Sequence, residues 1–154
     1  MPKVDLDSIE QVNRTGYPPP FNEAVAGRWE RRLGPATGLT DFGVSHVVLK
    51  PGAWSSQRHW HEGEDEFLVM LSGEAVLVED EGRTVMKAGD LAVWPKGVPN
   101  GHHLINEGAE DCSFVAFSGG ANKGGAYSDI DMMFTPEGTY VHKDGAPYDA
   151  KRQP

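Results

Sequence analysis

The sequence predicts an all-β fold, an antiparallel barrel or sandwich made of short strands. Short apolar runs recur at regular spacing between Thr40 and Ser118, and turn-forming residues separate them. The 19 glycines and 11 prolines are many for 154 residues, and they lie between the apolar runs. No segment has the periodicity of a long helix. We therefore expect about nine strands joined by tight turns.

The expected strands occupy the middle of the chain, and most of them end at a glycine or proline turn. Eight of them have clear bounds: residues 40–49, 55–61, 66–71, 74–79, 83–87, 91–94, 102–106 and 112–118. We expect three parts in one domain: an N-terminal arm (1–39), a β-barrel (40–118) and a C-terminal tail (119–154) that packs on the barrel or on a partner subunit. In the arm, Arg28, Arg31 and Arg32 surround Trp29, which indicates a structural collar.

Composition narrows the class of protein. Hydrophobic residues make up 38% of the chain and charged residues 24%, as in ordinary globular domains. The net charge of -9 argues against nucleic acid and against an anionic membrane surface as partners. The single cysteine, Cys112, excludes an internal disulfide. With neither a signal-peptide pattern nor a long apolar run, we expect a cytoplasmic protein.

A candidate metal site is visible in the stretch that begins at Gly52. His59 and His61 stand one residue apart, so in a strand both side chains lie on the same face while Trp60 lies on the other. A tight turn through residues 62–65 can reverse the chain and bring Glu66 beside them. Two imidazoles and a carboxylate are suitable ligands for a divalent transition metal.

A second group follows in residues 89–106, where a glycine turn opens a strand, a Pro-x-Gly corner closes it and His102 starts the next strand. Leu104 and Asn106 share the face of His102. These two stretches resemble the two motifs of the cupin superfamily. The matching residues are Gly52, His59, His61, Glu66 and Gly73 in the first motif, and Gly89, Pro95, Gly97, His102 and Asn106 in the second.

The resemblance implies a small single-domain cupin, a double-stranded β-helix or jelly roll. It also implies a metal held by three histidines and one glutamate, which here are His59, His61, Glu66 and His102. The corner before His102 is longer than in the family pattern, so His103 is the alternative fourth ligand. The metal can be Fe, Mn, Ni or Zn. Residues that share faces with these ligands are the candidate pocket lining: Gln57, Leu68, Met70, Leu104 and Asn106.

Function is expected to follow from this site. A metal-dependent enzyme acting on a small organic molecule is the leading hypothesis, with dioxygenase, isomerase and lyase chemistry all open. The alternative is a module that binds a metal or small ligand, or senses it, without turnover. The expected pocket contains no recognisable arginine or lysine cluster for a phosphate. A homodimer is expected, because small barrels with extended arms often close their sheet edges against a twin.

Overall fold

The computed structural model describes residues 3–148, and its regular secondary structure is almost entirely β-strand. Apart from one 3-10 turn and one short helix, the elements are antiparallel strands, so the all-β prediction is confirmed. In chain order the elements are η1 (Leu6–Ser8), β1 (Arg28–Arg32), α1 (Leu33–Thr37), β2 (Phe42–Leu49), β3 (His59–His61), β4 (Glu64–Ser72), β5 (Glu74–Glu79), β6 (Gly82–Lys87), β7 (Leu91–Trp94), β8 (His103–Ile105), β9 (Cys112–Gly120), β10 (Gly125–Tyr127), β11 (Met133–Phe134) and β12 (Tyr140–Val141).

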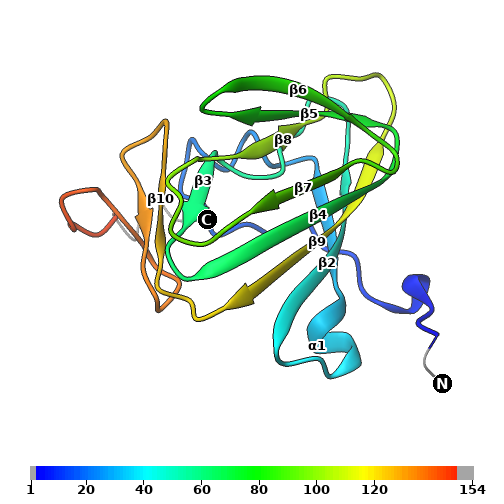
Figure 1. Cartoon of the computed structure of the whole chain (residues 1–154), viewed down its shortest axis with the longest axis horizontal. Helices are drawn as coiled ribbons and strands as arrows, with labels where there is room; N and C mark the ends of the chain where they lie inside the picture. The colour runs from blue at the N-terminus through cyan, green and yellow to red at the C-terminus, as the bar shows by residue number, and fades with distance from the viewer. Residues whose placement is uncertain (1–2, 149–154) are drawn as a thin grey trace.

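Three sheets build the fold (Figure 1). A five-stranded sheet has the order β1-β2-β9-β4-β7, and a three-stranded sheet has the order β6-β5-β8. A four-stranded sheet, β12-β11-β10-β3, lies at one end, where Figure 1 shows β3 and β10 together. Consecutive strands are often not neighbours in a sheet, since β4 pairs with both β9 and β7. This crossing order is that of a jelly roll rather than a meander.

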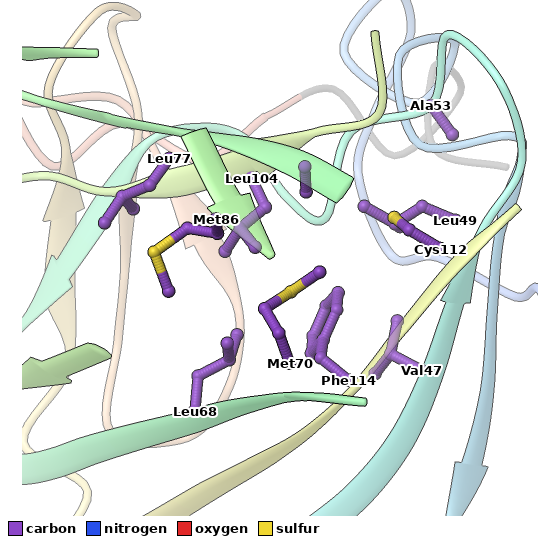
Figure 2. Packing of buried hydrophobic residues seen from close by; sticks show 11 residues of the cluster. Val47, Leu49, Ala53, Leu68, Met70, Leu77, Met86, Leu104, Cys112 and Phe114 are labelled. Carbon is purple, nitrogen blue, oxygen red and sulfur yellow. The ribbon is translucent and has the colours of Figure 1, made fainter. Parts of the chain in front are cut away.

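The main core fills the space between the five-stranded and three-stranded sheets (Figure 2). Inward-facing residues of β2, β4 and β9 meet those of β5, β6 and β8. The largest fully buried members include Leu49 and Met70, and burial of each such side chain stabilises the fold by about 1.5–3 kcal/mol. The labelled core residues in Figure 2 are Val47, Leu49, Ala53, Leu68, Met70, Leu77, Met86, Leu104, Cys112 and Phe114.

Both terminal segments pair with strands that lie within residues 40–118. The segment expected as an N-terminal arm contributes β1, which pairs along its whole length with β2. The segment expected as a C-terminal tail contributes β10, which pairs with β3 and so lies against the strand that carries His59 and His61. A second buried cluster, built on Tyr17, Val25, Tyr127 and Met132, joins the two terminal segments. Residues 149–154 of the expected tail lie outside the described residues.

No helix in residues 3–148 combines the length and the apolar character needed to cross a membrane.

Candidate metal centre

His59, His61 and Glu66 form a cluster that can hold a metal ion. Each offers one ligand atom, and these atoms all lie within 4.8 Å of one another. The two histidines come from β3 and the glutamate from β4, with the reversal between them at Glu62 and Gly63. Gly63 is buried, and a Cβ there would collide with the Ala121 carbonyl, so the close approach of the segment after β9 to this reversal requires glycine.

His102 lies directly beside this cluster. Its backbone pairs with that of His59, and its Nε2 is 2.8 Å from Oε2 of Glu66. Trp94 stacks on the imidazole, with 3.9 Å between ring centroids and 7° between planes, which fixes the ring orientation. The long corner at residues 98–101 therefore still delivers the His102 side chain to the glutamate.

His103, the alternative fourth ligand, has different partners. Its Nδ1 donates to the Ser56 carbonyl over 2.9 Å, and its ring packs edge-on against Trp54, with centroids 4.7 Å apart. The ring is buried rather than exposed. Of the two histidines, His102 is the one that contacts Glu66.

The His59 imidazole is in the neutral form that a metal ligand needs, with a nitrogen lone pair available. Its Nδ1 lies 2.9 Å from the Gln57 carbonyl, which can only accept, so this nitrogen carries the proton and Nε2 keeps a free lone pair. Burial lowers the pKa of His59 to about 4, and the neighbouring Glu66 only partly offsets this effect. His59 is therefore neutral at physiological pH, which is the form that binds metals.

Glu66 is the negative centre of the site. Burial raises the pKa of its carboxyl group, but hydrogen bonds with His102 and His61 outweigh burial, so the pKa lies well below its ordinary value. For His61, burial lowers the pKa, and the carboxylates of Glu66 and Glu64 more than compensate, so the pKa is raised. The partly buried carboxylate thus has only imidazole partners among the described residues, and positive charge near its oxygens stabilises it.

The predicted pocket-lining residues separate into two groups. Leu68 and Leu104 line the cavity beside the cluster. The other three, Gln57, Met70 and Asn106, are not among the residues that line this cavity, and each packs into another part of the fold. Gln57 donates through Nε2 to the Phe21 carbonyl (3.0 Å), and Met70 is buried in the main core. Asn106 is fully buried, and its side chain hydrogen-bonds only to backbone groups.

One cavity of about 620 Å³ opens from the cluster. This is within the usual range for small-molecule sites, about 300–1,000 Å³. Hydroxyl groups of Ser45, Ser56 and Ser118 line it together with the metal-site residues. Three arginines that sequence reasoning assigned to a collar or left unassigned also line it: Arg14, Arg28 and Arg32. Only long-range pairing reveals them, that of β1 with β2 for Arg28 and Arg32 and that of Val12 with Glu30 for Arg14.

Aromatic residues from the C-terminal segment cover the histidines. Phe134 packs edge-on against His61, with ring centroids 4.9 Å apart, and Tyr127 lies 5.7 Å from His59. Tyr127 in turn contacts Tyr17 of the N-terminal segment, at 5.6 Å. Sequence reasoning missed these residues, since the contact depends on the long-range pairing of β3 with β10.

Comparison with known proteins agrees with this architecture. The cupin domain family model matches residues 45–118. A crystal structure of a sugar phosphate isomerase from a cupin superfamily, from Silicibacter pomeroyi, shares 42% identity and a TM-score of 0.89, covering 98% of this chain and 99% of that one. A Cupin 2 conserved barrel domain protein from Salinispora arenicola shares 30% identity and a TM-score of 0.53, over 61% of this chain and 76% of that one.

A sequence relative is also found among curated proteins. Oxalate decarboxylase OxdC of Bacillus subtilis is 36% identical over 69 residues, which is 42% of this chain. The match spans only 18% of the length of that enzyme. The nearly complete alignment with the Silicibacter pomeroyi structure, the family match over residues 45–118 and the jelly-roll order of the strands together show that this chain belongs to the cupin superfamily.

Proposed function

We propose that this chain is a metal-dependent isomerase of a phosphorylated sugar. The observation that carries the proposal is the His59, His61 and Glu66 cluster at the wall of a cavity of about 620 Å³. The Silicibacter pomeroyi relative, described as a sugar phosphate isomerase and matched over nearly the full length of both chains, supports the choice of isomerase chemistry.

In this proposal the ligands of a divalent transition metal are His59, His61, Glu66 and His102. The donor set fits such an ion. A neutral imidazole with its Nδ1 held by a carbonyl presents Nε2 as a ligand, and His59 has this arrangement. His102 places its Nε2 2.8 Å from Oε2 of Glu66, so these two donor atoms lie side by side at the cluster.

Iron, manganese, nickel and zinc all accept such a mixed nitrogen and oxygen donor set. Three imidazoles and one carboxylate leave coordination positions free on an octahedral ion. When bound, the metal would supply Lewis-acid polarisation of a sugar carbonyl or hydroxyl oxygen.

The remaining residues of the cavity bind and shield the substrate. Ser45 and Ser118 offer hydroxyls on the inner face of the sheet, where a sugar needs both donors and acceptors. Leu68 and Phe114 form an apolar floor beside them. Phe134 and Tyr127 cover the histidines from the other side, which limits access of water to the reacting atoms.

The direct test is turnover of a panel of aldose and ketose phosphates by protein loaded separately with each of the four metals. Interconversion of an aldose phosphate and its ketose partner, followed by NMR, is the expected result. The variant His61→Ala should lose it. His142→Ala is the matched control, because His142 lies outside the cavity and is paired with Asp131 over 2.9 Å.

Two other outcomes contradict the isomerase proposal. Tight binding of a sugar phosphate without turnover in any metal form would identify a non-catalytic ligand-binding or sensor module. Turnover of oxalate, included in the panel because of the Bacillus subtilis relative, would identify a lyase.

A further inference from the structure

The inner face of β1 extends the cavity wall away from the metal centre. Residues opposite one another in a sheet point to the same face. Arg32 on β1 lies opposite Ser45 on β2, and Ser45 lies opposite Ala116 on β9. Ala116 in turn lies opposite Leu68 on β4, which lines the cavity. The side chain of Arg32 therefore starts on the same face as Leu68. Because side chains alternate along a strand, Arg28 shares this face, and both arginines line the cavity.

Arg31 lies on the opposite face of the same strand. Its Nε donates to the Ile9 carbonyl over 3.1 Å, and it forms an ion pair with Asp7 at 3.3 Å. Arg31 does not line the cavity. Neighbouring arginines on β1 thus have separate roles, which the sequence alone does not distinguish.

The charges on this part of the wall do not cancel. Arg28 pairs with Glu30 at 2.8 Å, so these two residues neutralise each other. Arg32 and Arg14 also line the cavity, and within residues 3–148 neither has an ion-pair or hydrogen-bonding carboxylate partner. Two arginines without counter-ions on one cavity wall are unexpected in a chain with a net charge of -9. Both side chains are exposed, so their positive charge lies at the open part of the cavity, where it attracts anions.

The segment that carries Arg14 is held against β1. Val12 and Glu30 exchange both backbone hydrogen bonds, at 2.9 and 2.8 Å, which places the residues after Val12 along the edge of the sheet. Asn13, Thr15 and Gly16 follow this edge and line the same cavity. Because the pairing is antiparallel, Arg14 lies beside Arg28, and Arg14 and Arg32 approach the cavity from positions four residues apart along β1.

The position of this wall suits one end of an extended ligand. Three strand spacings of about 4.8 Å separate the backbone of β1 from that of β4, roughly 14 Å in all. Glu66 is on β4 and Arg32 is on β1, with the serines and the apolar floor between them. A ligand with a polar end at the histidines and an anionic end at the arginines fits this layout.

We propose that Arg14 and Arg32 form the phosphate subsite of this cavity, binding the phosphomonoester of a sugar phosphate whose other end lies at the His59, His61 and Glu66 cluster. The subsite rests on the proposed function for the identity of its ligand. A guanidinium group presents paired N–H donors that match phosphate oxygens, so the two arginines confer a preference for phosphorylated over free sugars.

The test measures binding of sorbitol 6-phosphate, which has no carbonyl group and cannot isomerise, by calorimetry on metal-loaded protein. Sorbitol and inorganic phosphate are measured in parallel. The variants are Arg14→Gln and Arg32→Gln, with Arg31→Gln as the matched control on the other face of β1. Loss of a charge-assisted contact should weaken binding of sorbitol 6-phosphate about tenfold or more in each cavity variant. The affinity of Arg31→Gln should equal that of the unaltered protein.

Three results would overturn the subsite. The first is equal affinity of the unaltered protein for sorbitol and sorbitol 6-phosphate. The second is unchanged affinity for sorbitol 6-phosphate in both cavity variants. The third is inorganic phosphate binding as tightly as sorbitol 6-phosphate, which would show that the arginines bind free phosphate and that the sugar adds nothing.

The two proposals fail separately. If the substrate panel shows turnover, Arg14→Gln and Arg32→Gln should raise KM with little change in kcat. The reason is that the arginines would bind the phosphate group equally in the substrate and in the transition state. Turnover with an unchanged KM in both variants would remove the subsite and leave the isomerase. Arginine-dependent binding of sorbitol 6-phosphate without any turnover would keep the subsite and remove the isomerase.

Discussion

Replacing Asn106 by alanine is expected to destabilise the fold while leaving the metal centre intact. The side chain is fully buried and makes three hydrogen bonds to backbone groups. Its Nδ2 donates to the carbonyls of Leu49 and Glu110, both over 2.8 Å, and its Oδ1 accepts from the Gly108 amide over 3.0 Å. It therefore joins the end of β2 to the turn before β9.

The magnitude follows from these contacts. Each bond contributes about 1 kcal/mol, and a backbone group left buried without a partner costs more, which gives a loss of about 2–4 kcal/mol in the free energy of unfolding. For a chain of this size the melting temperature should fall by roughly 5–15 °C. Asn106→Asp should destabilise at least as much at neutral pH, because it directs a carboxylate at two carbonyl oxygens.

Urea unfolding followed by fluorescence, with metal content measured on the same samples, is the assay. Asn122→Ala is the matched control, since Asn122 also makes two bonds to backbone but is exposed, and water can replace them. It should cost less than about 1 kcal/mol. The reasoning is refuted if Asn106→Ala is no less stable than Asn122→Ala. It is also refuted if Asn106→Ala keeps its stability but loses metal, because Asn106 would then act in the site.

Three further predictions concern a variant of Trp94, the reactivity of Cys112 and the oligomeric state. Trp94→Leu removes the ring that stacks on His102 and should weaken metal binding about tenfold in a chelator competition; unchanged affinity would show that the stacking does not position the ligand. Burial raises the pKa of the Cys112 thiol to about 11, so the thiol stays protonated at neutral pH and should react with a thiol reagent only after unfolding; rapid reaction of the native protein would contradict this. The homodimer remains a prediction, and sedimentation of the unaltered protein tests it; a monomer would contradict it. If the edge strand β7 forms the interface, the double variant Leu91→Asp with Val93→Asp should be monomeric, because these side chains are 60% and 63% exposed on that strand.

The strands could be predicted from local patterns because each lies between turns that the sequence marks clearly. Gly52, Gly73, Gly89 and Gly97 all have positive φ, the conformation that favours glycine at a tight turn. The spacing of His59 and His61 likewise determines their common face once they are in a strand. These features depend on neighbours in the sequence, so a single sequence contains them.

The parts that were missed depend on long-range pairing. The arginines of β1 reach the cavity only because β1 joins the edge of the sheet beside β2, and Tyr127 reaches His59 only because β10 pairs with β3. Asn106 shares a strand-face pattern with His102, but its side chain turns to backbone carbonyls after β8 has ended. Alternation along a strand does not predict orientation beyond the end of that strand.

The central claim is that His59, His61, Glu66 and His102 hold a divalent transition metal. Elemental analysis of the purified protein beside Glu66→Gln, which keeps the shape of the side chain and removes its charge, tests this claim most directly. We expect a stoichiometric transition metal in the unaltered protein and little or none in a folded Glu66→Gln variant. Full metal content in that variant, or the absence of metal from the unaltered protein across several preparations and after incubation with each of the four metals, would contradict the account.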